Sequence, residues 1–288
     1  MKKILVTGSN GQLGNEMRVL SAQYPQFEYI FTDVAELDIC NRDAVVAFVE
    51  ANKPDYIVNC AAYTAVTKAE TDIALSTAIN RDAVGNIGFA AKKTGVKVVH
   101  VSTDYVFDGT GHLPYTEADP ICPNSMYGKT KAEGEAALTA TGAESVILRT
   151  SWLYSSFGNN FVKTMIKLGK ERDALTVIFD QIGTPTYAAD LASAIMQIIS
   201  SVKFETGIYH FSDEGVCSWY DFTKSIHKLW GITTCKVSPL ETKDYPDKTP
   251  RPFYSVLNKA KIKTVYGIVI PHWEESLQRC LDILKKGA

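Results

Sequence analysis

Short apolar segments alternate with helical segments over the first two thirds of this 288-residue chain, and this alternation restricts the fold more than any other feature. The expected strands are residues 3–7, 28–32, 55–59, 96–102 and 145–149. The helical segments between them are residues 12–22, 42–51, 73–93 and 125–141. Short strands that alternate with longer helices form βαβ units, and strands this apolar need helices on both faces. The sequence therefore predicts an α/β fold with a doubly wound parallel sheet.

The pattern becomes less regular after about residue 150. Helices are expected at residues 161–170, 187–201, 219–230 and 272–285, and strands at residues 175–179 and 207–211. Residues 237–252 are polar and contain four prolines, which is typical of a loop. We therefore predict a sheet domain of residues 1–150, to which elements within residues 175–211 return. A smaller C-terminal lobe is predicted from residues 151–174 and 212–288.

Composition and charge exclude several classes of function. The chain has 30 basic and 32 acidic residues, a net charge of -2, and hence no basic surface for nucleic acid or an anionic membrane. No apolar run is long enough to span a bilayer, and the run at residues 4–6 is too short for a signal peptide. The six cysteines lack the C-x-x-C spacing of zinc sites and redox pairs. Free thiols indicate a reducing compartment, so we expect a cytoplasmic protein.

The first expected strand is followed by three evenly spaced glycines, Gly8, Gly11 and Gly14, and then by a helix. A dinucleotide-binding turn uses glycines because the chain turns tightly, its backbone approaches a pyrophosphate, and the helix packs closely on the strand. The N–H groups at the start of the helix then face the phosphates. We therefore interpret the sheet as Rossmann-type, residues 1–150 as a dinucleotide-binding domain, and the smaller lobe as substrate-binding.

The choice between NADH and NADPH stays open at this point. Asp33 ends the second expected strand, where a carboxylate accepts a hydrogen bond from the ribose 2′-OH and favours NADH. Asp38 competes for the same contact. Arg18, on the first expected helix, favours a 2′-phosphate and therefore NADPH.

Tyr127 and Lys131 are four residues apart in an expected helix, so their side chains share one face. A phenol with a pKa of about 10 is a poor acid or base at neutral pH, and a neighbouring ammonium lowers that pKa. This spacing also describes two exposed residues on a solvated helix. Its position after the dinucleotide turn, and after the expected strand end at Ser102 and Thr103, favours a catalytic pair.

Several longer motifs resemble those of the extended short-chain dehydrogenase/reductases, and the resemblance covers the whole chain. They add to the glycine turn, the Ser102-Thr103 strand end and the Tyr127-x-x-x-Lys131 pair. The matching segments are residues 59–66 (NCAAYTAV), 68–70 (KAE), 102–109 (STDYVFDG), 127–131 (YGKTK), 149–152 (RTSW), 183–186 (GTPT) and 251–252 (RP). One departure is Thr67, where this pattern has an Asp before Lys68.

The resemblance, with the positions of the strand ends, implies three sets of site residues. The catalytic set is Thr103, Tyr127 and Lys131. The cofactor-binding set is Gly8, Asn10, Gly11, Gln12, Leu13, Gly14, Asp33, Asp38, Ile39, Ala61, Ala62, Tyr63, Tyr127 and Lys131. The substrate-binding set is Thr103, Asp104, Tyr105, Trp152 and Arg251.

The activity that the resemblance implies is reduction by NADPH or NADH of the C4 keto group of dTDP-4-dehydro-L-rhamnose, which gives dTDP-L-rhamnose. The expected partner is therefore a small-molecule nucleotide sugar. In this mechanism Tyr127 donates the proton and the Thr103 hydroxyl gives a second hydrogen bond to the oxygen. Lys131 would hold the ribose hydroxyls and lower the pKa of the phenol.

Two alternatives stay open on the same fold. A nucleotide-sugar 4-epimerase needs the same threonine, tyrosine and lysine, and a non-catalytic NADP(H)-binding regulatory subunit needs only the cofactor site. A 4,6-dehydratase is disfavoured because its Thr-Asp-Glu motif is replaced here by Thr103-Asp104-Tyr105.

Some members of the family bind Mg²⁺ between two subunits through acidic residues, which would imply a homodimer. Glu16 matches one such ligand. No acidic pair accompanies it near residues 187–190, so we expect no metal site.

Overall fold

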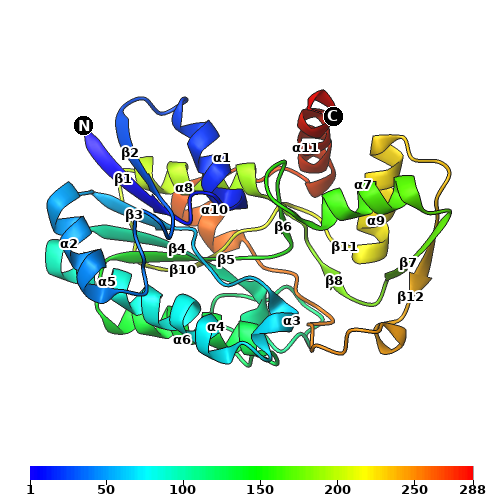
Figure 1. The fold of residues 1–288 in the computed structure, drawn as a ribbon, viewed down its shortest axis with the longest axis horizontal. Coiled ribbons are helices and arrows are strands. Elements are labelled where there is room, and N and C mark those ends of the chain that lie inside the picture. The colour runs from blue at the N-terminus through cyan, green and yellow to red at the C-terminus, as the bar shows by residue number, and fades with distance from the viewer. Residues whose placement is uncertain (288) are drawn as a thin grey trace.

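The computed structural model describes residues 1–287, and within them six parallel strands form one sheet in the order β10-β5-β4-β3-β1-β2 (Figure 1). These strands are β1 (Lys2–Thr7), β2 (Phe27–Thr32), β3 (Tyr56–Asn59), β4 (Lys97–Thr103), β5 (Ser145–Thr150) and β10 (Gly207–His210). The chain starts in the interior of the sheet, moves outward to β2, and returns to the other side of β1 at β3. Such a reversal of strand order marks the edge where ligands bind in α/β folds.

Helices cover both faces of the sheet, as the apolar strands predict (Figure 1). One face carries α1 (Gln12–Ser21), α8 (Ala188–Ser200) and α10 (Ala260–Tyr266). The other carries α2 (Arg42–Asn52), α5 (Ala83–Thr94) and α6 (Met126–Ala140). Successive side chains of β1 alternate between the two cores, since Ile4 and Val6 face α8 while Leu5 faces α5. The predicted doubly wound α/β fold is confirmed.

The later part of the chain adds a smaller lobe, drawn to the right in Figure 1. Its helices are α7 (Phe161–Glu171), α9 (Trp219–Trp230) and α11 (Trp273–Lys286). Its strand pairs are β7 (Ala174–Ile178) with β12 (Lys236–Leu240), β8 (Ile182–Gly183) with β11 (Cys217–Ser218), and β6 (Leu153–Tyr154) with β9 (Thr186–Tyr187). No helix among the described residues is both long and apolar enough to cross a membrane.

The helix expected at residues 73–93 is interrupted by a π-helical turn. It consists of α4 (Ile73–Thr77), the turn Ala78–Asp82, and α5. Within the turn, the Asn80 side chain accepts a hydrogen bond from Tyr63 N (2.8 Å) and donates to Tyr63 O (3.1 Å) and Thr130 Oγ1 (3.2 Å). The widened turn therefore connects the chain after β3 to α6. The short helix α3 (Val66–Ala69) was not expected.

The expectation of a loop at residues 237–252 is wrong for its first residues, because these form part of β12, which pairs in parallel with β7. Pro239 is tolerated there because β12 belongs to a sheet of two strands, where each strand has a free edge. This pairing also keeps β7 out of the large sheet, so of the elements expected to return to it, only α8 and β10 do so. The division into two domains stays a prediction.

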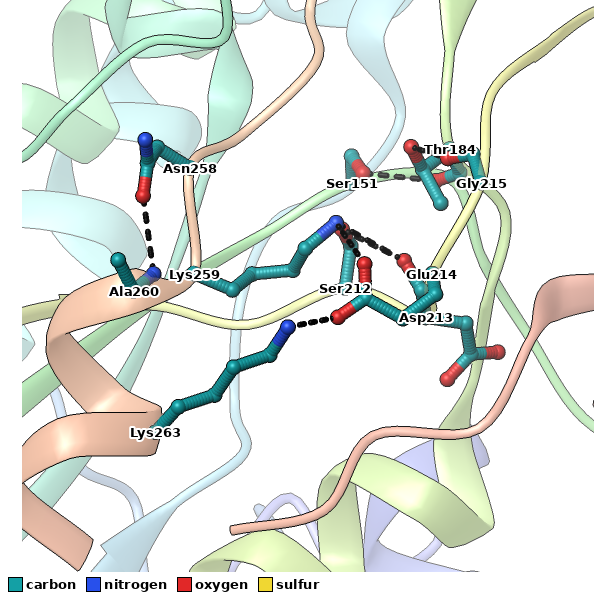
Figure 2. Close-up of polar contacts among 10 residues, drawn as sticks. All are labelled: Ser151, Thr184, Ser212, Asp213, Glu214, Gly215, Asn258, Lys259, Ala260 and Lys263. Atoms are coloured by element: carbon teal, nitrogen blue, oxygen red, sulfur yellow. Dashed lines mark hydrogen bonds and ion pairs between the residues drawn. The ribbon is translucent and has the colours of Figure 1, made fainter. Parts of the chain in front are cut away.

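The segment after β10 is attached to α10 by a buried lysine (Figure 2). Lys259 is 8% exposed, and its ammonium donates to Asp213 O at 3.2 Å and pairs with Glu214 at 3.4 Å. Lys263 pairs with the same carboxylate. Burial lowers the pKa of Lys259, whereas Glu214 favours its charged form. These contacts fix the direction in which the chain leaves the sheet for the smaller lobe.

Candidate active site

The glycine turn between β1 and α1 has the geometry that a phosphate-binding turn requires. Gly8 has a φ of +64°, and a Cβ on it would lie 2.6 Å from Ala61. A Cβ on Gly14 would lie 2.5 Å from Gly8 O. Gly11 is the N-cap of α1, and among the described residues no side chain caps this helix. The first N–H groups of α1 are therefore available to a diphosphate.

A cavity of about 710 Å³ opens beside this turn. Eight of the predicted cofactor-binding residues line it: Gly8, Asn10, Gly11, Asp33, Asp38, Ile39, Ala61 and Ala62. The Asp33 carboxylate accepts hydrogen bonds from Asn10 N (3.0 Å) and Val34 N (2.9 Å), which hold it at the cavity wall. Arg18 is outside the described lining and stacks on Phe31, with its guanidinium 4.2 Å from the ring centroid. The cavity is thus suited to a nucleoside whose ribose faces Asp33.

A second cavity of about 580 Å³ shares Gly11, Cys60 and Ala62 with the first. It lies at the ends of β4 and β5 and collects nine further predicted residues. They are Gln12, Leu13, Thr103, Asp104, Tyr105, Tyr127, Lys131, Trp152 and Arg251. Gly14 and Tyr63 belong to neither described lining. The Tyr63 hydroxyl instead donates to Asp72 at 3.1 Å.

Thr103 and Tyr127 face one another across this second cavity. Thr103 ends β4, and its hydroxyl donates to Asp104 Oδ1 at 2.9 Å. Tyr127 lies in the first turn of α6, which is capped by Ser125 (Gly128 N to Oγ, 3.2 Å). Burial raises the pKa of Tyr127, although a hydrogen bond with Thr103 acts in the opposite direction. The phenol is therefore protonated at neutral pH.

Lys131 is 2% exposed, and its ammonium donates to Val101 O at 2.6 Å. Burial lowers the pKa of Lys131 to about 8, and Glu135 partly restores it. The expectation that Lys131 lowers the pKa of Tyr127 is wrong for this structure. Loss of water around the phenolate is the largest influence on that pKa and raises it, and the opposing influence comes from the Thr103 hydroxyl, not from Lys131.

Asp104 is also buried in the cavity wall, at 1% exposure. Burial raises its pKa to about 6. Its Oδ2 atom has no hydrogen-bond partner among the described residues. Arg251 approaches from the loop after β12, pairs with Asp247 at 3.1 Å, and also interacts with the Tyr105 hydroxyl. The cavity wall therefore combines a buried carboxyl group that has one unpartnered oxygen with a guanidinium that is held by Asp247.

Two tryptophans form the wall contributed by the smaller lobe. Trp152 stacks on Trp219, with ring centroids 3.5 Å apart and planes 10° from parallel. Trp152 has a φ of +47°, and a Cβ on Gly183 would lie 2.6 Å from its ring. Strain in a bulky residue of this kind gathers at functional sites. Trp219 also lines the cavity, although no sequence motif marked it as a site residue. An aromatic residue at a helix start carries no distinctive signal for this.

The structure also brings a second element into the site that the sequence analysis missed. Residues 158–160, between β6 and α7, line the second cavity. Asn160 Nδ2 donates to Gln12 Oε1 at 2.9 Å and so connects this segment to the glycine turn.

Glu16, the candidate Mg²⁺ ligand, is buried against the smaller lobe. Its carboxylate accepts a hydrogen bond from Ser155 Oγ at 2.6 Å. Burial, aided by the charge of Asp190, raises its pKa. Among residues 1–287, no group of three or more His, Cys, Asp or Glu side chains is arranged to hold a metal ion.

Comparison with known proteins assigns the family. The model of the RmlD substrate binding domain matches residues 1–286. A dTDP-4-dehydrorhamnose reductase of Aggregatibacter actinomycetemcomitans is 41% identical over 96% of this chain and 98% of its own length. This chain belongs to the RmlD family of dTDP-4-dehydrorhamnose reductases.

Two solved RmlD-family structures superimpose on almost the whole fold. A dTDP-4-dehydrorhamnose reductase of Clostridium acetobutylicum has a TM-score of 0.94 and 45% identity, covering 98% of this chain and 99% of that chain. A Bacillus anthracis dTDP-4-dehydrorhamnose reductase, solved in complex with NADP, has a TM-score of 0.94 and 38% identity, covering 98% and 100%. The predicted family is confirmed.

Proposed function

We propose that this protein reduces the C4 keto group of dTDP-4-dehydro-L-rhamnose to give dTDP-L-rhamnose, with NADPH or NADH. The observation that carries the proposal is one cavity, beside the glycine turn, that holds Thr103, Tyr127 and Lys131 together. The names of its relatives support the same substrate. The reaction needs a hydride, a proton donor and a stabilised oxygen.

The residues of the first cavity fit a nicotinamide dinucleotide. Its diphosphate would lie over Gly11 and the start of α1, and its adenosine ribose against Asp33. When bound, the reduced nicotinamide supplies the hydride to C4. The Lys131 ammonium, in the wall of the second cavity, would hold the nicotinamide ribose hydroxyls.

Tyr127 is proposed to donate the proton to the C4 oxygen. Because burial raises the pKa of this phenol, the proton stays on Tyr127 until the oxygen gains negative charge. The Thr103 hydroxyl would turn from Asp104 to give a second hydrogen bond to that oxygen, as an oxyanion-hole donor does.

The remaining wall residues are proposed to select the nucleotide sugar. The flat pair of Trp152 and Trp219 offers an apolar surface to a deoxysugar ring. Arg251 can make two parallel hydrogen bonds to a diphosphate oxygen pair. Asp104 and Tyr105, which both line the cavity, would make polar contacts to the sugar hydroxyls.

The test is an assay of purified protein with reduced cofactor and the dTDP-linked 4-keto sugar. The proposal predicts consumption of one cofactor per sugar and an alcohol at C4 of the product. Interconversion of C4 epimers without net consumption of cofactor would instead identify an epimerase. Cofactor binding without turnover of any dTDP- or UDP-linked 4-keto sugar would favour a regulatory subunit.

Two broader aspects belong to the same proposal. The cytoplasm is the proposed compartment, which the six free cysteines support. A homodimer is proposed on the family resemblance, and sedimentation of the purified protein measures it directly. Reduction of the sugar by a monomer would leave the catalytic proposal intact and remove the dimer.

A further inference from the structure

A third side chain continues the line of Tyr127 and Lys131 along α6. Glu135 lies one turn beyond Lys131 on the same helix face and is 3% exposed. Its carboxylate accepts hydrogen bonds from Ser102 Oγ at 2.5 Å and from Arg149 Nε and Nη2 at 3.0 and 2.7 Å. Both partners come from the sheet, since Ser102 on β4 is paired in register with Arg149 on β5. Glu135 thus joins α6 to two strand ends that open into the site.

A fully buried ion pair of this kind needs an explanation other than stability. The Arg149 and Glu135 side chains are 3% and 4% exposed. Apolar residues of similar volume often stabilise a core as well as a buried ion pair does, because the charges lose their hydration. Ser102 directly precedes Thr103, so a shift of Glu135 would also move the threonine hydroxyl.

The charges around Lys131 single out Glu135 in a second way. Among the described residues, Glu135 is the carboxylate whose charge raises the pKa of Lys131. His100 on β4 also faces the ammonium, but burial and the charge of Lys131 lower its pKa well below the usual range, so it stays neutral. Arg149 on β5 is cationic, and Tyr127 on α6 is a protonated phenol.

We infer that Glu135 is a positioning residue of the active site. It holds α6 and the Ser102–Thr103 strand end in one arrangement, and its negative charge keeps Lys131 protonated. A buried ammonium without a counter-ion loses its proton, and a neutral amine binds ribose hydroxyls less strongly and no longer favours charge on the C4 oxygen. The catalytic meaning of this inference rests on the proposed function.

The experiment titrates Lys131 directly, in protein labelled with ¹³C at the lysine ε-carbon. The Lys131 NMR signal is assigned by its loss in Lys131→Met, and its midpoint is followed against pH. Glu135→Gln removes the charge while almost preserving the shape, and Glu135→Asp keeps the charge on a shorter side chain. The pH profiles of kcat and KM are measured in parallel.

In Glu135→Gln the titration midpoint of Lys131 is expected to fall by roughly one to three pH units. The alkaline limb of the pH profile of kcat should move to lower pH with it. Glu135→Asp should keep the Lys131 midpoint close to the wild-type value and retain the wild-type position of that limb. A wild-type Lys131 midpoint in Glu135→Gln would overturn the inference, even if kcat falls.

Two further arms keep the test decisive. If Glu135→Gln does not fold because Arg149 is left unpaired, Glu135→Gln combined with Arg149→Met removes both charges and allows the same titration. Wild-type protein that does not reduce the sugar would refute the proposed function. The Lys131 midpoint would still decide the role of Glu135, because it needs no turnover.

Discussion

At the scale of single residues, burial moves the three key groups of the site toward their neutral forms. It raises the pKa of Tyr127, lowers that of Lys131 to about 8, and raises that of Asp104 to about 6. Each charged form is disfavoured because the cavity wall replaces water. A proton donor that resists ionisation is suited to reduction, since it releases its proton only to the developing alkoxide.

Tyr127→Phe tests the proton donor. The change preserves the ring that lies edge-on to Tyr105 at 5.4 Å and removes only the hydroxyl. We expect normal folding and cofactor binding, with kcat reduced by a factor of ~10² to 10⁴ in single-turnover reduction of the sugar. The matched control is Tyr266→Phe, whose hydroxyl donates to Glu205 O outside both cavities. Similar rates for the two variants would contradict the assignment.

Asp104→Asn tests the cost of a buried carboxyl group. Its folded-state pKa of about 6 exceeds the unfolded value of about 3.9, so the folded state binds more protons between these values. Its contribution to stability is complete below pH 4 and is lost as the pH rises through 6. Asp104→Asn should therefore be more stable than wild type at pH 7, with a free energy of unfolding that is higher by about 2–3 kcal/mol.

Urea denaturation of wild type and Asp104→Asn at pH 4 and pH 7 measures this difference. The gap should nearly close at pH 4, where the folded-state carboxyl is protonated and the unfolded-state carboxyl is about half protonated. Activity should fall at either pH, because a contact to the sugar is altered. An equal gap at both pH values would show that the titration of Asp104 does not cause it.

At the scale of elements, the site depends on how closely α6 approaches the π-helical turn before α5. A Cβ on Gly134 of α6 would lie 2.0 Å from Asn80 O, a backbone atom that cannot rotate away. On Gly85 of α5 it would lie 3.5 Å from Ala137, an ordinary contact. The two glycines are therefore matched positions on packed helices. Only Gly134 has to be glycine for α6 to lie this close to the π-helical turn.

Gly134→Ala is expected to lower the melting temperature and to reduce kcat, because it displaces the helix that carries Tyr127 and Lys131. Gly85→Ala should stabilise the protein by about 0.5–1 kcal/mol, the gain in helix propensity, and leave kcat unchanged. Calorimetry and steady-state assays of both variants measure this. A tolerated Gly134→Ala would show that the contact between α6 and the turn is looser than the structure indicates.

At the scale of the whole molecule, the large sheet supplies the cofactor turn and the smaller lobe supplies a wall of the second cavity. The two parts are connected at the turn by the hydrogen bond between Gln12 and Asn160 (2.9 Å). Gly11 lines both cavities, so a branched side chain there would extend into the path of the cofactor. Cofactor binding should accordingly raise the melting temperature of the whole protein.

Thermal unfolding with and without NADPH tests this coupling. At a cofactor concentration of about 100 Kd, the wild-type protein should gain about 2.7 kcal/mol, or roughly 5–10 °C in Tm. Gly11→Val should fold but lose most of that shift, whereas Gly85→Ala should retain it. A full shift in Gly11→Val would refute the placement of the diphosphate over this turn.

Local patterns made much of this fold predictable. Each of the five strands of the first 150 residues forms within one or two residues of its expected bounds, because each is a short apolar run between helical segments. The expectation of a loop at residues 237–252 was wrong for β12, because its pairing is decided by β7, a strand 62 residues earlier in the chain. Gly11 and Thr103 meet at one cavity because a parallel sheet gathers its strand ends at one edge, and α6 brings Tyr127 and Lys131 to the same cavity.

By itself, the sequence determined the doubly wound sheet, the glycine turn and the spacing of Tyr127 and Lys131, since each depends on neighbours along the chain. The tertiary structure alone decided the stack of Trp152 on Trp219, the burial of Glu135 against Arg149, and the directions of the pKa shifts. These depend on groups far apart in sequence. Desolvation in particular is set by everything packed around an atom, which no local pattern encodes.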